Sequence, residues 1–181
     1  LDLTVENHRV TQVKVNMGNP VFEPKKIPVL SEKDRVINES IQAADREWKI
    51  TVLSMGNPHG VIFTEDVDTL DLEKIGPKFE RHPWFPDRIN TEFIRVLDDR
   101  TIQMRVWERG SGETMACGTG ACAAAVASAL NGYTGPEVRV RLLGGDLDIF
   151  WDREENQVYM TGPATTVFEG EIYLEGEEEH V

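Results

Sequence analysis

Residues 116–132 read ACGTGACAAAVASALNG, and small apolar side chains occupy every face of the helix that this stretch predicts. A surface helix would carry a polar stripe, whereas here Ser128 is the only polar residue in the middle of the helix. A helix that is apolar all round is buried on all sides. The stretch therefore predicts a central helix over 118–130, ended by Asn131-Gly132, whose small side chains let strands approach closely.

Short strands separated by turn residues surround this helix in the sequence. Alternation of apolar and polar residues, the pattern of a half-buried strand, is clearest in VTQVKVNM and WKITVLSM. A second helix is expected over 70–82, weakened by Gly76 and Pro77. The fold class predicted is α+β, a mostly antiparallel sheet wrapped around a central buried helix. The expected strands are 10–17, 48–55, 59–67, 91–97, 101–108, 137–143, 146–151 and 157–162.

Composition narrows the classes of partner. The chain has 181 residues, 40% of them hydrophobic, which suffices for one core of ordinary size. Its net charge of -13 disfavours nucleic acid and anionic membranes as partners. No apolar run approaches the roughly 20 residues of a membrane helix, and the first residues lack a signal-peptide pattern, so a cytoplasmic setting is expected. The two cysteines are too few for a disulfide framework and are expected to be reduced thiols.

Cys117 stands where the central helix begins. Unsatisfied N–H groups and the positive end of the helix dipole stabilise a thiolate there, so the position favours a reactive cysteine. Glycines at 118 and 120 leave those N–H groups open to an anion such as a carboxylate. Taken alone, Cys117 could equally be a small buried residue, as most free cysteines are. We interpret Cys122 as such a buried residue. It lies about 140° further round the helix than Cys117, so the two side chains point apart, which disfavours a disulfide or a shared metal site.

Glu108 and Arg109 end the strand that leads into this helix. The carboxylate could hold the thiol proton, and the guanidinium could bind a substrate carboxylate through two hydrogen bonds. Charges at a strand end are more often solvated, so this pair by itself decides nothing.

Three blocks of sequence resemble the diaminopimelate epimerase family. WERGSGETMACGTGACAAA (107–125) is similar to the signature of the family's C-terminal half, and MGNPHGVIF (55–63) and FPDRINTEF (85–93) match two further blocks in the right order. The resemblance runs from about Val13 to about Leu174. It implies an enzyme that interconverts LL- and meso-diaminopimelate in lysine and cell-wall precursor biosynthesis, without pyridoxal phosphate, any other cofactor or a metal. Two pseudo-symmetric domains, each a sheet around a central helix, supply one acid/base cysteine each.

The resemblance also implies a role for each matching residue. Cys117 is one of the two thiols, Glu108 is its proton-holding neighbour, and His59 assists the other cysteine. Gly118 and Thr119 offer backbone N–H groups to the carboxylate beside the reacting carbon. The residues expected to bind the distal carboxylate of the substrate are Asn57, Asn90 and Arg109. Outside the resemblance, the two asparagines would pass for turn formers and His59 for a strand-end histidine.

The family's other cysteine belongs to an N-terminal half that these residues do not supply. We therefore expect residues 1–15 to be a connecting strand from a missing first domain, 16–162 the C-terminal epimerase domain, and 163–181 a returning strand and acidic tail. The implied partners are diaminopimelate and the N-terminal half of the same enzyme, and a homodimer is compatible with the resemblance. Two alternatives stay open: a related epimerase of the proline racemase type, and a non-catalytic domain that binds an amino acid or docks to a separate half.

Overall fold

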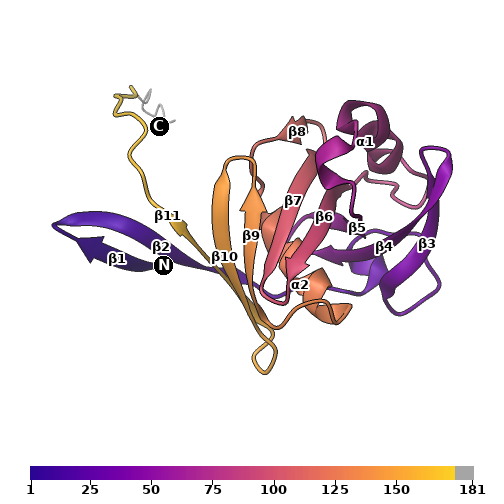
Figure 1. Cartoon of the computed structure of the whole chain (residues 1–181), viewed down its shortest axis with the longest axis horizontal. Coiled ribbons are helices and arrows are strands. Elements are labelled where there is room, and N and C mark those ends of the chain that lie inside the picture. Colours follow the sequence, from indigo (N-terminus) through magenta and orange to yellow (C-terminus); the bar gives the residue numbers. More distant parts are fainter. Residues whose placement is uncertain (174–181) are drawn as a thin grey trace, which may run out of the picture.

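The computed structural model describes residues 1–173, which form eleven strands, two α-helices and two short 3₁₀ turns (Figure 1). In chain order the elements are β1 (Asp2–Glu6), β2 (Arg9–Gly18), η1 (Pro24–Lys26), β3 (Val36–Ala43), β4 (Arg46–Ser54), β5 (Pro58–Phe63), η2 (Val67–Thr69), α1 (Leu72–Glu80), β6 (Asn90–Asp98), β7 (Thr101–Glu108), β8 (Gly112–Thr114), α2 (Gly118–Leu130), β9 (Glu137–Leu142), β10 (Gly145–Asp152) and β11 (Gln157–Pro163).

All the strands belong to one sheet, in the order β1-β2-β11-β10-β9-β7-β6-β5-β4-β3, with β8 paired to β7 outside this path. Most neighbours are antiparallel and joined by short turns. The exceptions are the pairs β5/β6 and β7/β9, which are parallel. Each parallel pair encloses a helix in the sequence, α1 in the first and α2 in the second, because parallel neighbours need a long crossover connection. The sheet is therefore mixed and largely antiparallel.

The central strands are apolar on both faces. Side chains alternate between the two faces of a strand, and in β6 Phe93 belongs to the core on the α1 side while Ile94 belongs to the core around α2. In β7, Trp107 and Val106 divide in the same way. Burial on both faces explains why these strands show nearly continuous apolar runs rather than clean alternation.

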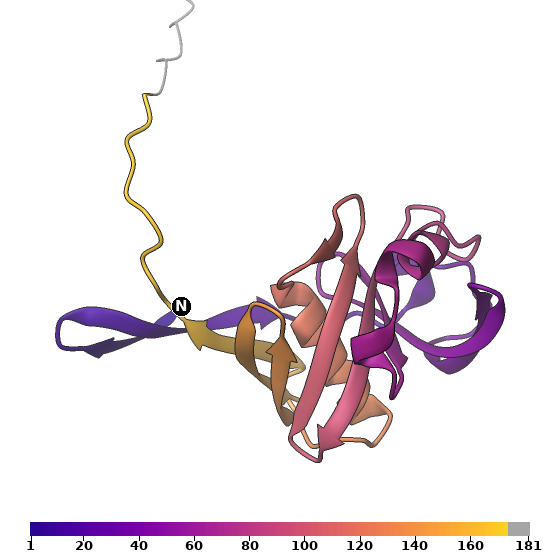
Figure 2. The ribbon, with the colours of Figure 1, turned by 45° about the horizontal axis from the view of Figure 1, so that its top comes forward.

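Helix α2 lies against the concave face of this sheet, which curves round it (Figure 2). Every residue from Gly120 to Ala129 is buried, and the helix contacts β4, β5, β6, β7, β9, β10 and β11. Seven strands can pack against one helix of 13 residues only because eight of those residues are glycine or alanine. The close packing fixes the position of the first turn of α2, where Cys117 is the N-cap residue.

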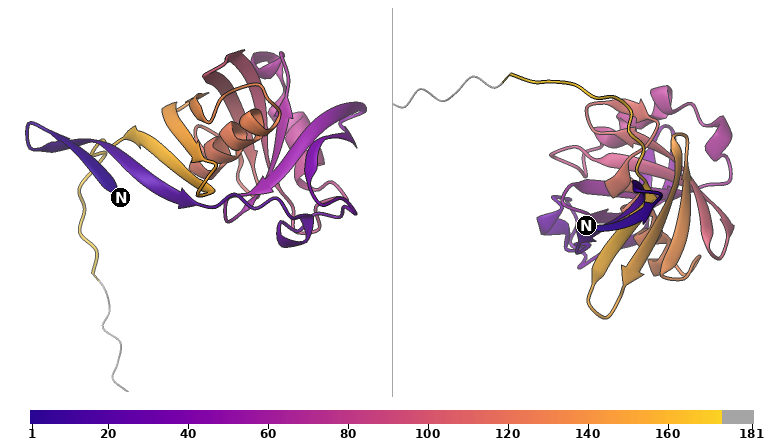
Figure 3. Two further views of the ribbon diagram at one scale, coloured as in Figure 1. Left: turned by 90° about the horizontal axis from the view of Figure 1, so that it is seen from below. Right: turned by 90° about the vertical axis from the view of Figure 1, so that its left-hand side faces the viewer.

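The two ends of the described chain extend away from this body. The β1–β2 hairpin projects from one side, and residues 164–173 run outward from the end of β11 (Figure 3). All five residues of β1 are exposed. Residues 1–15, expected as one connecting strand, thus form β1 and most of β2, and no strand follows Pro163 within the described residues. The acidic tail expected at 175–181 lies outside them.

Most of the predicted elements are present. The α+β class and the largely antiparallel sheet are confirmed, and α2 has the predicted bounds of 118–130. The strand predicted over 59–67 is wrong at its end, because the chain leaves the sheet after Phe63 and turns into η2. Strands β3 and β8 were not predicted, and the strand expected over 1–15 is divided into β1 and part of β2. The part of the chain that the structure describes contains no helix long and apolar enough to cross a bilayer.

Gly76 offers a test of how α1 packs on the sheet. A Cβ at this position would lie 2.2 Å from Cδ2 of Trp107, so Gly76→Ala requires α1 or the indole ring to move. We expect a loss of about 1–3 kcal/mol in the free energy of unfolding, even though alanine is the better helix former by up to about 1 kcal/mol. Urea denaturation followed by circular dichroism measures the change. The matched control is Gly135→Ala, where a Cβ meets no atom within 4 Å, and equal stability of the two variants would contradict the packing.

Candidate active site

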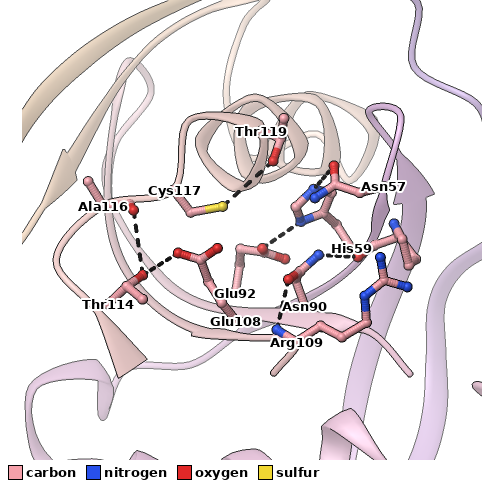
Figure 4. Close-up of polar contacts among 11 residues, drawn as sticks. Asn57, His59, Asn90, Glu92, Glu108, Arg109, Thr114, Ala116, Cys117 and Thr119 are labelled. Atoms are coloured by element: carbon pink, nitrogen blue, oxygen red, sulfur yellow. Dashed lines mark hydrogen bonds and ion pairs between the residues drawn. The ribbon is translucent and has the colours of Figure 1, made fainter. Parts of the chain in front are cut away.

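The strand directions bring the predicted site residues to one edge of the sheet (Figure 4). Strands β5 and β6 are parallel, so their first residues lie together, and His59 pairs with Asn90. Strand β7 is antiparallel to β6 and ends at Glu108 on the same edge. The N-terminus of α2, with Cys117, faces this edge. The structure therefore brings together residues that are 58 positions apart in the sequence, from His59 to Cys117.

The Cys117 thiol is largely buried and surrounded by polar groups. Its exposed fraction is 8%, and Sγ lies 3.6 Å from Thr119 Oγ1. Burial raises the pKa of the Cys117 thiol to about 11, and the nearby carboxylates of Glu92 and Glu108 add to the rise. Thr119 and the backbone N–H of Gly120 oppose this shift. The N–H of Gly120 in the first turn of α2 thus favours the thiolate, in the direction expected of a helix N-terminus, but desolvation and two carboxylates outweigh it.

Glu108 has a fixed orientation beside the thiol. Its Oε1 accepts a hydrogen bond from the Thr114 hydroxyl, which lies in the short strand β8. Thr114 also lies 3.5 Å from the carbonyl of Ala116, immediately before Cys117. The strand β8 thus links the carboxylate to the chain segment that carries the cysteine, consistent with the proton-holding role that the sequence implied for Glu108.

His59 is completely buried and held from both sides. Its Nε2 lies 2.9 Å from Asn57 Oδ1, and its Nδ1 lies 2.7 Å from Glu92 Oε1. Asn57 stands in the turn before β5, next to Gly56, whose positive φ of 94° favours glycine. Two polar contacts at the two ring nitrogens leave the imidazole one orientation. His59 therefore cannot turn toward a substrate without breaking one of them.

Asn90 joins two segments of the site. Its side chain donates to the carbonyl of Pro58 at 2.8 Å and accepts from the backbone N–H of Arg109 at 2.9 Å. The guanidinium of Arg109 donates to the carbonyl of Asp87 at 3.0 Å and lies in an exposed setting. The amide of Asn90 is thus occupied by backbone groups, whereas Arg109 projects at the rim of the site (Figure 4).

The first turn of α2 presents backbone N–H groups. The first intrahelical hydrogen bond runs from the N–H of Ala121 to the carbonyl of Cys117, at 2.9 Å, so the N–H groups of Gly118 and Thr119 precede the helical pattern. Such groups bind anions at helix N-termini. A Cβ on Gly118 would lie 3.2 Å from Met160 Sδ, which shows how closely β11 approaches this turn.

Glu92 is the site residue that the sequence analysis missed. It lies in the buried first part of β6 and is 0% exposed. Burial raises the pKa of the Glu92 carboxyl, while the ion pair with His59 opposes the rise. The sequence does contain a sign of it, since an acidic residue inside a strand that is otherwise buried needs a partner. Among the described residues, no group of three or more His, Cys, Asp or Glu is arranged to hold a metal ion.

Solved structures with this fold are epimerases and racemases of small amino acids, among others. A probable proline racemase from Agrobacterium radiobacter K84 superposes with a TM-score of 0.62 over 98% of this chain and 58% of its own, at 13% identity. A hydroxyproline epimerase from Agrobacterium vitis, solved with bound trans-4-OH-L-proline, gives 0.60 over 89% of this chain and 52% of its own, at 14% identity. At these identities the similarity establishes the fold alone.

Sequence similarity narrows the class to one family. The family model described as diaminopimelate epimerase matches residues 51–167. A diaminopimelate epimerase from Methanococcus maripaludis strain C5 is 58% identical over 95% of this chain, and one from Acetivibrio thermocellus is 55% identical over 96%. The chain belongs to the diaminopimelate epimerase family. It spans 62% of the length of each of these two relatives.

The two thiols should differ in reactivity. Cys117 is 8% exposed with a pKa of about 11, whereas Cys122 is fully buried with a pKa of about 12. Both pKa values lie above neutral pH, so both alkylation rates rise with pH, and the difference of one unit gives Cys117 roughly ten times the thiolate fraction. The weaker nucleophilicity of the less basic thiolate takes back about a factor of three, so we expect iodoacetamide to label Cys117 about threefold faster or more near pH 8, as measured by peptide mapping after brief exposure. Equal labelling in the folded protein would contradict the site assignment.

Proposed function

We propose that this chain supplies one of the two catalytic halves of a cofactor-independent epimerase that interconverts LL- and meso-diaminopimelate. The observation that carries the proposal is the placement of the Cys117 thiol at the first turn of α2, beside Glu108 and the N–H groups of Gly118 and Thr119. In this proposal α2 is the central helix of the domain, with Cys117 at its mouth. The sequence relatives named diaminopimelate epimerase support the choice of reaction.

Epimerisation by this route moves two protons and no electrons to any cofactor. A thiolate on one face of the substrate takes the α-proton, so the C–H bond breaks and its electron pair stays on the carbon. A thiol on the opposite face then delivers its proton to that electron pair, which forms the C–H bond of the other isomer. The two sulfurs have exchanged roles, so each turnover leaves the site ready for the reverse reaction.

The electrostatics of the site support a protonated Cys117 at the start of the reaction with one of the two isomers, in which the other cysteine is the thiolate. A thiol with a pKa of about 11 keeps its proton at neutral pH and can donate it to a carbanion, which is a far stronger base. The carbanion itself needs stabilisation of the adjacent carboxylate, because there is no electron sink in this mechanism. We assign that role to the N–H groups of Gly118 and Thr119.

We assign to the residues at the rim of the site the selectivity for a substrate that carries a second, distal carboxylate. Arg109 can bind a distal carboxylate through two hydrogen bonds, and its backbone is positioned by Asn90. Asn57 lies next to His59 at the mouth of β5. In this proposal His59 assists the other cysteine, while Asn57, Asn90 and Arg109 bind the distal carboxylate. The lysine and cell-wall pathways and the cytoplasmic setting are further predictions of the same kind.

The other half of the enzyme is the proposed partner of the exposed ends of the chain. Large apolar side chains are exposed on β1 and in the segment after β11, including Leu3 at 57%, Phe168 at 83% and Tyr173 at 90%. A hollow of about 930 Å³ lies between the start of β2 and the segment after β11, lined by Arg9, Val10, Thr11, Ala164, Thr165, Thr166 and Glu169. Apolar surface of this kind is typical of a protein–protein contact. We infer that it packs against the proposed N-terminal half of the enzyme; this chain covers 62% of the length of its relative.

A second candidate function is an epimerase of the proline racemase type. A probable proline racemase and a hydroxyproline epimerase share the fold, and the two-thiol chemistry would be the same. Arg109 at the rim favours the dicarboxylic substrate instead, because a proline-sized substrate has no distal carboxylate to bind. A non-catalytic domain that binds an amino acid would not need the thiol, which makes the cysteine the residue to test.

Replacing Cys117 in the complete enzyme tests the proposal. Cys117→Ala should abolish epimerisation in both directions, since one positioned acid/base group contributes about 10²–10⁴ in rate and both directions need two such groups. Cys117→Ser should retain at most weak activity, because a hydroxyl is a poorer acid and base than a thiol yet can still relay a proton. The measurement is kcat for each isomer.

Cys122→Ala is the matched control, because Cys122 lies on the same helix and loses only packing. Its turnover should stay near that of the wild type, with circular dichroism to confirm that each variant is folded. Near-normal turnover in folded Cys117→Ala, together with loss of turnover in Cys122→Ala, would show that the wrong cysteine had been assigned.

A further inference from the structure

Glu92 is a buried carboxyl group to which the proposed reaction assigns no role. Its side chain is 0% exposed, Oε1 lies 2.7 Å from His59 Nδ1, and Oε2 has no hydrogen-bond partner among the residues that the structure describes. Burying a carboxyl group with one oxygen unsatisfied is costly. An apolar residue would fill the same space in β6 at lower cost, so the carboxyl group points to a function at this site.

Gly120 shows how close Glu92 lies to the reactive thiol. The point where a Cβ of residue 120 would stand lies 2.7 Å from Glu92 Oε1 and 3.1 Å from Cys117 Sγ. The carboxylate and the sulfur are therefore within the distance of about 6 Å at which one charge shifts the ionisation of another group. Any residue larger than glycine at position 120 would press on both groups.

The contacts of His59 indicate where protons lie on its ring and between His59 and Glu92. Asn57 Oδ1 can only accept a hydrogen bond, so His59 Nε2 carries a proton. The contact of 2.7 Å between His59 Nδ1 and Glu92 Oε1 holds a second proton. Both ring nitrogens of His59 thus lie within hydrogen-bond distance of an oxygen atom, which is the arrangement in which an imidazolium donates two hydrogen bonds.

We propose that Glu92 is a positioning residue of the epimerase site: it holds His59 in one orientation as a buried ion pair, and its carboxylate charge disfavours ionisation of the Cys117 thiol. The inference rests on the proposed function, because a thiol that stays protonated is useful only if Cys117 acts as the acid of an epimerase. The charged and titratable groups that surround Cys117 are Glu92 from β6, Glu108 from β7, His59 from β5 and Cys122 from α2. After burial, Glu92 is the largest cause of the raised pKa of Cys117.

Alkylation of Cys117 in this chain tests the effect of the charge. Glu92→Gln keeps the shape and a hydrogen bond to His59 but removes the charge. One unit of pKa decrease raises the thiolate fraction roughly tenfold, and the weaker nucleophilicity of a less basic thiolate takes back about a factor of three. We therefore expect Cys117 in Glu92→Gln to react with iodoacetamide at pH 8.5 about threefold faster or more than in the wild type.

Glu39→Gln is the matched control. Glu39 lies on β3 and is paired with Lys33; its replacement removes the same unit of negative charge, and it is not among the groups that shift the pKa of the Cys117 thiol. Its Cys117 should react at the wild-type rate. Equal rates in Glu92→Gln and Glu39→Gln would overturn the proposal, because a merely structural role for Glu92 changes folding and not the ionisation of the thiol.

A second measurement needs no variant. Nitrogen NMR of the ¹⁵N-histidine-labelled wild-type chain reports whether both ring nitrogens of His59 carry protons near pH 7, as the ion pair requires. An unprotonated Nδ1 would overturn the proposal even if Glu92→Gln failed to fold. Neither measurement uses turnover, so failure of the proposed epimerase reaction would appear in the activity of Cys117→Ala and not in these results.

Discussion

Alanine side chains of helix α2 lie directly against seven strands, and this close approach determines where the site can be. Because the helix cannot shift without opening a buried core, its first turn is held at the edge of the sheet where β5 and β6 begin and β7 ends. Cys117, the N-cap residue, is thereby placed among side chains from three strands. A larger residue in the middle of α2 would therefore be expected to act on the site as well as on stability.

The same packing excludes water from the site, and this changes the chemistry of the thiol. At an exposed helix N-terminus the dipole would favour a thiolate. Here desolvation, Glu92 and Glu108 all favour the protonated form, and only Thr119 and the N–H of Gly120 oppose them. The site is thus suited to hold a proton until a stronger base, such as a carbanion, is formed beside it. A cysteine protease would need the opposite arrangement, with a cation next to the sulfur.

Local sequence patterns predicted much of the fold, and long-range pairing limited the rest. The apolar helix over 118–130 and the strands over 91–97 and 101–108 show patterns that depend on neighbouring residues, so they could be predicted directly. Strand β3 and the parallel pairing of β5 with β6 depend on partners distant in the sequence. At the site, the resemblance supplied eight residues, but Glu92 was missed because its significance depends on the meeting of β6 with α2. The effect of Glu92 on the pKa of Cys117 could not be predicted from the sequence, because it depends on the burial and the charges around the thiol in the folded chain.

The central claim is that this chain contributes one of two thiols and needs the rest of the enzyme for the other. The most direct measurement is the interconversion of LL- and meso-diaminopimelate, followed by chiral chromatography, with this chain alone and with the complementary N-terminal segment of the Methanococcus maripaludis relative, which is 58% identical over the shared part. We predict no conversion by the chain alone and conversion when the segment is added, limited by whichever component is scarcer. Conversion by the chain alone, at a rate proportional to its concentration, would contradict the claim.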